Sequence, residues 1–206
     1  MGKLKKTKVE MKAQKEALKR FERFLPMLQL KKQQLQVEIQ GITAKIDIVF
    51  ERVYEVQADL DSWISLLSEP VDLESLIAVE AVDTSRGNIA GVSIPVLEKV
   101  TMKPALHDLF ETPPWIDDAI RSVGRLVELE VERKILETQR ALISEELRVT
   151  SQRVNLFEKV KIPECKENIR VIKIFLGDEQ TASVARGKIA KRRRVSEEPA
   201  EETADR

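Results

Sequence analysis

The sequence predicts a mainly α-helical protein, a long antiparallel two-helix coiled coil with a small central region of β-hairpin and short helix. Three observations predict this fold. Charged residues make up 34% of the 206 residues and aromatic residues only 4%, a composition typical of long solvated helices. Two long segments repeat apolar residues every seven positions. The segment between them instead carries two short apolar runs around turn-forming residues.

The first long helix is predicted within residues 1–68. From Leu18 onward, stepping alternately by three and four residues, fourteen of fifteen positions are apolar. A mean spacing of about 3.5 residues predicts a left-handed supercoil. Pro26 is expected to kink this helix, or to mark its start with residues 1–24 as a separate piece. The predicted seam on this helix contains Leu35, Ile39, Ile42, Ile46, Val49 and Val53.

The second long helix is predicted within residues 113–190, with Thr112 as its N-cap and Gly177 as a candidate earlier end. Its apolar stripe changes register at Pro163, which predicts a local change of supercoil or a bend. Each helix needs a partner for its apolar stripe, and an antiparallel pairing of the two satisfies both. The predicted seam on this helix contains Leu136, Ile143, Leu147 and Val154.

The central domain, residues 69–112, has a different pattern. Two apolar runs, 76–82 and 89–94, flank the turn-forming residues 83–88, which predicts a β-hairpin with its turn at that point. Pro95 is expected to confine the second strand to an edge or to end it. Because an isolated hairpin is marginally stable in water, we expect it to lean on a helix or a partner.

Charge is balanced over the whole chain but not locally. Residues 1–36 hold 11 basic and 3 acidic residues, and residues 159–194 hold 11 and 4, whereas residues 69–118 hold 3 and 10. The tail 191–206 lacks an apolar period and is predicted to be disordered. The basic cluster Lys191–Arg194 is interpreted as a helix end that meets acidic surfaces, with a nuclear address or a phosphate-binding patch as alternatives.

The sequence offers little for catalysis. A single cysteine, Cys165, excludes an intrachain disulfide, and a single histidine, His107, disfavours histidine-based metal or nucleophile sites. The glycine-rich nucleotide-binding, zinc-binding and serine-hydrolase motifs do not occur. We therefore expect no catalytic residue, cofactor or metal. No apolar run approaches the roughly 20 residues of a membrane span, so a soluble intracellular chain is expected.

Three segments carry a family resemblance. They occur along the chain in the order and with the spacing of the family: Leu25–Leu35, then Asn88–Pro95, then Arg153–Glu158 followed by Ile162 and Pro163. Together they resemble the D subunit of V-type and archaeal A-type rotary ATPases over about residues 5–190. Pro26 departs from the glycine of many members and suggests a bacterial subtype. The residues that match the family signature are Asn88, Gly91, Pro95, Arg153, Asn155 and Pro163.

This resemblance implies a non-catalytic rotor shaft that couples ATP hydrolysis or synthesis to proton or sodium transport. Its implied partners are the catalytic A and non-catalytic B subunits, the small F subunit of the stalk and the funnel-like C/d subunit above the membrane ring. It implies a cytoplasmic location, peripheral to the membrane, with no nucleic acid and no direct membrane insertion. A generic coiled-coil scaffold or tether, and a helical nucleic-acid-binding protein, are the alternatives. The candidate ring contacts are Lys188, Lys191, Arg192, Arg193 and Arg194.

Overall fold

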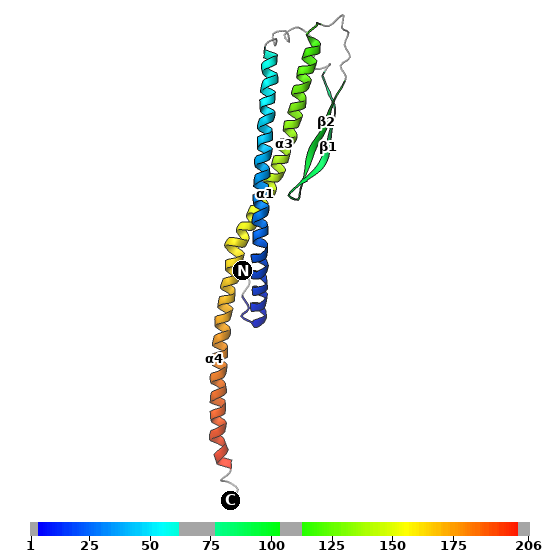
Figure 1. Ribbon diagram of the computed structural model, residues 1–206. Coiled ribbons are helices and arrows are strands. Elements are labelled where there is room, and N and C mark those ends of the chain that lie inside the picture. Colours follow the sequence, from blue (N-terminus) through cyan, green and yellow to red (C-terminus); the bar gives the residue numbers. More distant parts are fainter. Residues whose placement is uncertain (1–3, 62–76, 104–112, 202–206) are drawn as a thin grey trace. The chain divides into compact units, whose positions relative to one another are not determined.

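The computed structural model describes residues 4–61, 77–103 and 113–201, with side chains described up to residue 194. Along the chain, one antiparallel hairpin lies between two long helical segments (Figure 1). This arrangement confirms the predicted fold class. Residues 105–110, for which the sequence favours a loop or a single helical turn, lie outside the described residues. In chain order the elements are α1 (Lys8–Asp61), β1 (Val79–Ile89), β2 (Val92–Met102), α3 (Ile116–Leu156), the π-helical turn η2 (Phe157–Lys161) and α4 (Ile162–Glu201).

The chain forms two compact units. Unit 1 comprises residues 1–29 and 152–206, so it brings together the N-terminal part of α1 with the end of α3, η2 and α4. Unit 2 comprises residues 30–151 and contains the larger, C-terminal part of α1, the hairpin and most of α3. Each unit therefore contains an α1 segment and a helical segment from the C-terminal half of the chain.

Helix α1 is one continuous helix of 54 residues with Pro26 inside it, so the structure does not divide the chain near residue 24. It begins after Thr7, whose side-chain oxygen accepts a hydrogen bond from the Glu10 amide at 3.2 Å. Pro26 removes one backbone donor, but apolar residues on both sides of it are partly buried. Burial of one continuous stripe therefore outweighs the loss of a single hydrogen bond.

The hairpin is present, but its turn is not where the sequence analysis placed it. The two-residue connection is Ala90–Gly91, with φ of 51° and 85°, and residues 83–88 belong to β1. Positive φ at both positions is typical of a type I′ turn, whose twist matches that of antiparallel strands. Gly87 lies within β1, where glycine allows a close approach of the two strands. A Cβ atom at this position would lie 2.7 Å from Cγ2 of Val96.

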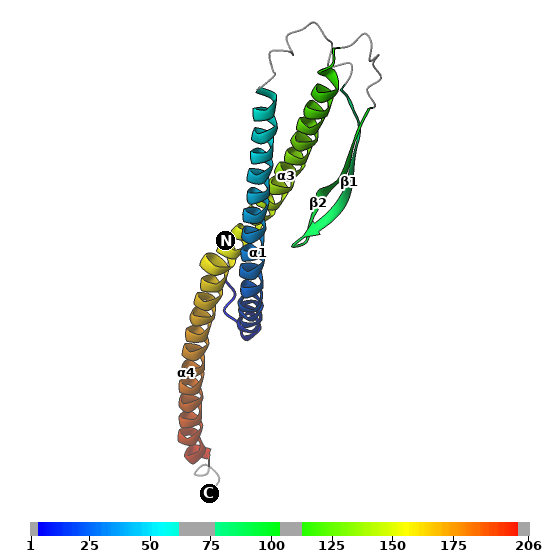
Figure 2. The ribbon, with the colours of Figure 1, turned by 45° about the horizontal axis from the view of Figure 1, so that its top comes forward.

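Strand β2 also runs through Pro95 to Met102, so Pro95 does not end it. A two-stranded sheet has two open edges, and a proline is tolerated where its nitrogen faces one of them. The pairing is interrupted by register shifts between Val79 and Ala81 and between Asp83 and Thr84. Figures 1 and 2 both show the hairpin beside α3.

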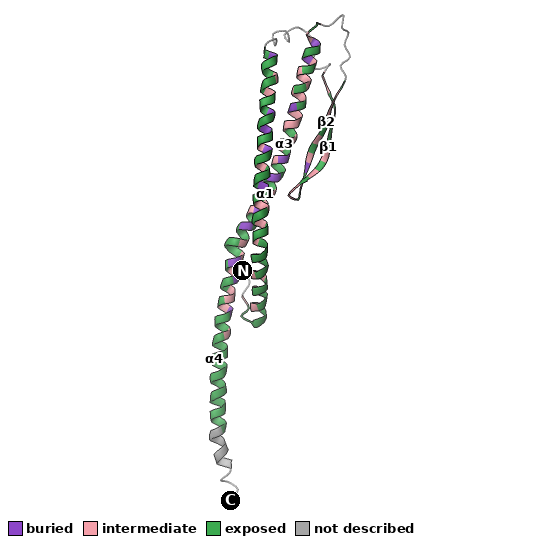
Figure 3. Ribbon diagram, in the orientation of Figure 1, coloured by how far each residue is buried: buried purple, intermediate pink, exposed green. Residues whose placement is uncertain are grey.

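The core of unit 2 lies where α1, α3 and the hairpin tip meet. Its buried members are largely β-branched or leucine side chains that repeat at heptad spacing on the two helices. Figure 3 shows buried positions recurring along α1 and α3, among exposed residues on α1 and among intermediate and exposed residues on α3. The cluster consists of Leu35, Ile42, Ile46, Val49, Ile94, Leu129, Leu136 and Ile143.

Helix α4 continues through Gly177 and ends at Glu201, so the structure describes 191–201 as helix where disorder was predicted. Residues 202–206 lie outside the described part. Every residue from 177 to 194 is exposed. Ala, Lys, Arg and Glu have favourable helix propensities, which favours helix in this segment without a buried apolar stripe.

Candidate functional site

The first candidate site is the seam between α1 and α3 in unit 2. Nine of the ten predicted seam residues belong to its cluster or pack against it, and both Leu35 and Ile143 have no exposed surface. The tenth, Val154, is buried in unit 1. Of the nine, three are partly buried: Ile39, Val53 and Leu147.

Charged contacts cross this seam at its margins. Lys31 Nζ lies 2.6 Å from Glu146 Oε1, and both side chains are about one-third exposed. The Arg133 guanidinium bonds Glu130 and Glu137 on its own helix and lies 5.5 Å from the centre of the Phe50 ring on α1. These contacts connect charged or aromatic side chains of α1 and α3 and thereby favour one alignment of the helices.

Arg133 also perturbs its neighbour. The hydrogen bond that its guanidinium donates lowers the pKa of Glu130 below the usual value, and burial opposes this shift only partly. The carboxylate is 43% exposed, so solvent screens much of the interaction. The cluster is consequently an ionised surface network rather than a proton-transfer site.

The hairpin tip is held to the helices by one apolar and one polar contact. Ile94 is 3% exposed within the core cluster, and Ile89 and Val92 pack against it. Gln139, itself 8% exposed, donates a hydrogen bond from Nε2 to the Pro95 carbonyl. A buried amide with a partner avoids the desolvation penalty of an unpaired one. The expectation that the hairpin leans on a helix is thus fulfilled by its tip.

Sequence reasoning missed Gln139. Its signal was present, because Gln139 falls between Leu136 and Ile143 in the apolar ladder and is polar where an apolar residue is expected. Such a position indicates a buried polar contact whose partner the sequence does not specify.

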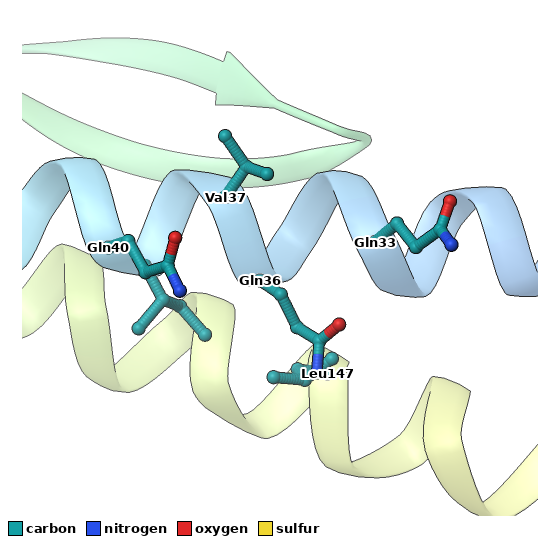
Figure 4. Close-up of a pocket in the computed structure, with 6 residues that line it drawn as sticks. Gln33, Gln36, Val37, Gln40 and Leu147 are labelled. Atoms are coloured by element: carbon teal, nitrogen blue, oxygen red, sulfur yellow. The ribbon is translucent and has the colours of Figure 1, made fainter.

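A shallow groove of about 680 Å³ runs beside the seam (Figure 4). Gln36 extends toward Leu147 of α3 in this view, whereas Val37 points away from it. The described lining consists of glutamine amides, which donate and accept hydrogen bonds, and of aliphatic side chains, which do neither. None of these side chains titrates in the physiological range. This groove offers contact surface and no acid–base chemistry. Its lining residues are Gln33, Gln36, Val37, Ile39, Gln40 and Leu147.

In unit 1, α1 meets η2 and α4. The rings of Phe21 and Phe157 lie 4.9 Å apart between centroids, and Lys166 Nζ is 3.5 Å from Glu22 Oε1. Cys165 is 5% exposed on the same face, and burial raises the pKa of its thiol. A protonated buried thiol is a weak nucleophile, so Cys165 is a packing residue here.

The family-signature residues divide between the two units. Asn88, Gly91 and Pro95 surround the hairpin turn in unit 2, where the Gly91 amide donates a 3.0 Å hydrogen bond to Asn88 Oδ1. Arg153 and Asn155 are exposed near the end of α3, and Pro163 is the second residue of α4; all three belong to unit 1. The structure therefore does not gather the signature into one site.

The candidate ring contacts lie in the exposed part of α4. From residue 177 to residue 194 this helix carries six basic and two acidic residues. Two apolar side chains in it, Val184 and Ile189, are 59% and 57% exposed. A helix exposed on all faces gains nothing from tertiary packing, so this segment suits contact with another chain. Lys188, Lys191, Arg192, Arg193 and Arg194 are all exposed.

Within the described residues, no group of three or more His, Cys, Asp or Glu side chains is arranged to hold a metal ion. His107 lies outside that part of the chain. In the same described ranges, no helix has the length and apolar character needed to cross a membrane.

Comparison with known proteins gives the family. Residues 10–192 match the family model of the ATP synthase D subunit. A V-type ATP synthase D subunit from Borreliella burgdorferi is 48% identical over 191 residues, which cover 93% of this chain and 95% of the relative. The proteins of that name from Chlamydia pneumoniae and Chlamydia trachomatis serovar L2 are each 34% identical, over 196 and 197 residues and at least 92% of both chains. The match spans nearly the whole chain and confirms the resemblance noted in the sequence. The chain belongs to the family of ATP synthase D subunits.

Proposed function

We propose that this chain is the non-catalytic central-stalk subunit, the rotor shaft, of a V-type rotary ATPase. It couples ATP hydrolysis or synthesis in a hexamer of A and B subunits to proton or sodium transport by a membrane ring. The observation that carries this proposal is near full-length similarity to proteins named as the D subunit of V-type ATP synthase.

The packing of the chain supports a torque-bearing role. A shaft must resist twisting, and α1 is an uninterrupted helix whose apolar stripe is buried or partly buried from Leu35 to Leu60. Fully buried Leu35 and Ile143 hold α1 to α3 within unit 2. Interdigitated apolar side chains at heptad spacing resist sliding and rotation of one helix on the other.

The chemistry of the described residues supports a non-catalytic role. The groove beside the seam is lined by amide and aliphatic side chains. The ion pairs are at least partly exposed, some within one helix and two, Lys31–Glu146 and Lys166–Glu22, between helices. We infer that nucleotide chemistry belongs to the A and B subunits. The chain acts on the cytoplasmic side of the membrane as a peripheral part of the complex.

The proposed partners are the A and B subunits, the F subunit of the stalk and the funnel-like C/d subunit above the membrane ring. The exposed basic helix of α4 supports a contact with the hexamer, because long cationic side chains make adjustable, solvent-screened contacts. Such contacts favour several orientations without fixing one. Residues 1–29 share unit 1 with α4, so both strongly basic segments contribute to the same unit.

The test is co-expression with the A, B and F subunits of the same genome, followed by size-exclusion chromatography and mass measurement. We expect one copy of this chain per three A and three B subunits, because a single axle occupies a threefold ring. A free homodimer that ignores all three partners would instead support a coiled-coil scaffold. Salt-sensitive binding of duplex DNA by the isolated chain would support the nucleic-acid alternative.

The basic cluster is tested separately in the assembled complex. In the variant, glutamine replaces Lys188, Lys191, Arg192, Arg193 and Arg194. We expect this change to weaken the coupling of ATP hydrolysis to rotation more than it weakens binding of the F subunit. The matched control replaces five exposed basic residues of unit 2, which lie outside both basic segments: Lys45, Arg52, Arg121, Arg125 and Lys134. Unchanged coupling in the α4 variant would contradict the assignment of ring contacts.

A further inference from the structure

The α3–α4 helix changes its hydrogen-bond pattern at η2. The Ile162 amide donates to the Phe157 carbonyl, five residues back, so this turn holds one residue more than an α-helical turn. We propose that η2 is a phase-setting joint, a one-residue insertion that keeps the apolar face of α4 turned toward α1 in unit 1. This inference concerns the isolated chain and stands whether or not the proposed function holds.

The phase of the buried stripe supports this proposal. Before η2 the stripe runs through Thr150, Val154 and Phe157, alternating steps of four and three. Continued without a break, that ladder would next use positions 161, 164, 168 and 171. The most deeply buried positions are instead Ile162, Cys165 and Ile172, with Ile169 partly buried between them, each displaced by one residue. Positions 161, 164, 168 and 171 are only partly buried.

The displacement equals the single residue that a π-helical turn adds. One residue corresponds to a rotation of about 100° in an α-helix. A regular α-helix over 157–161 would therefore place Lys161 and Glu164 on the face that meets α1. It would also turn away Cys165 and Ile172, which are 5% and 0% exposed.

Pro163 provides a second, separable cause for the π-turn. Proline has no amide hydrogen, and its ring clashes with the carbonyl four residues back, here that of Lys159. A wider turn relieves that clash. If proline alone caused the π-turn, replacing it would restore the α-helix and rotate the stripe; if the stripe sets the phase, the π-turn persists.

The contacts around η2 are consistent with a turn whose rotation is set by the residues on either side of it. None of its five residues is buried, and its one ring contact is made by Phe157, at its first position. It is fixed on one side by the Phe21–Phe157 ring contact and on the other by Ile162 and by Lys166, which pairs with Glu22. Packing on both sides specifies the rotation across the joint.

For the proposed rotor shaft, the joint has one further consequence. Helix α4 is continuous from Ile162 to Glu201, so a rotation at η2 is carried to the whole exposed basic segment. The joint then sets the angular position of Lys188 and Arg192, together with the packed face of α4, relative to α1 in unit 1.

The experiment uses the full chain and Cys165, its single cysteine, as the probe. The rate at which a thiol reagent labels Cys165 under native conditions reports which way this face of α4 points. Three variants are compared with the wild type: Pro163→Ala, Pro163→Ala with Lys159 deleted, and Pro163→Ala with one alanine inserted after Lys159.

We expect Pro163→Ala to label within about twofold of the wild type, because packing retains the π-turn. Deleting Lys159 removes the extra residue, so a regular α-helix then presents Ile162, Cys165 and Ile172 in phase and Cys165 stays protected. The inserted alanine rotates Cys165 off the face, and labelling becomes about tenfold faster or more. Circular dichroism checks that each chain remains helical.

The matched control deletes Glu167, an exposed residue in the same helix, in the Pro163→Ala background. It removes as many residues as the Lys159 deletion but rotates Ile172 out of the seam, so the urea midpoint is expected to fall. The proposal is overturned if Pro163→Ala alone exposes Cys165, or if the Lys159 deletion labels as fast as the insertion. It is also overturned if the two deletions are equally destabilising, or if the insertion leaves Cys165 protected.

Discussion

Replacing Ile94 with alanine tests how the hairpin is held to the helices. The side chain is 3% exposed and is a member of the core cluster. The substitution removes three carbons, which at about 0.8 kcal/mol each corresponds to roughly 2.4 kcal/mol of lost transfer free energy. A residual cavity adds to this, so a loss of about 2–4 kcal/mol is expected.

This loss should appear as local opening of the hairpin. Apart from Ile94, the tip is held by the Gln139–Pro95 hydrogen bond and by partly buried neighbours. Losing about 2 kcal/mol corresponds to a roughly thirtyfold rise in the open population. Native-state hydrogen exchange should therefore accelerate about thirtyfold or more in β1 and β2, while amides near Ile143 in α3 change little.

Val82→Ala is the matched control for this measurement. Val82 lies in the same hairpin but is 39% exposed and outside the core cluster. It should leave hairpin exchange close to that of the wild type. Equal acceleration in the two variants would refute the assignment of Ile94 as the docking residue. Equal acceleration in the hairpin and in α3 would show that the hairpin opens only with the whole unit.

Three further predictions follow from the packing. Ile143→Ala, at a side chain with no exposed surface, should lower the free energy of unfolding in urea by about 2–5 kcal/mol, whereas a loss below about 1 kcal/mol would contradict a tightly packed seam. Gly91→Val places a β-branched residue at φ 85° and should destabilise the hairpin by about 1–2 kcal/mol, measured by exchange of its amides, with Gly41→Ala as an unstrained control. Because Arg133 lowers the pKa of Glu130, that pair stabilises the fold above the carboxylate's unfolded pKa and stops doing so as the pH falls through the lower folded value. In urea unfolding, the wild-type advantage over Arg133→Gln should be smaller at pH 3 than at pH 7, and a pH-independent difference would contradict this prediction.

The candidate site was predictable where it depends on a repeating pattern. The ladder beginning at Leu18 identified the α1 seam, because an antiparallel helix pair buries whichever face repeats near 3.5 residues. The hairpin signature around Asn88 and Gly91 was also recognised, although its turn was misplaced. Gln139 was missed, because one polar residue in an apolar ladder does not name the carbonyl it will meet.

The sequence by itself determined the helices and the phase of their apolar faces, because those follow from local spacing. The sequence also showed that the apolar stripe changes register at Pro163, but not that a π-helical turn produces this change. Tertiary structure alone decided the position of the turn, since the residues 83–88 favour a turn locally but are paired when Ile94 enters the core. It likewise placed the extra residue in η2, because only packing against α1 on both sides fixes how far the helix must rotate.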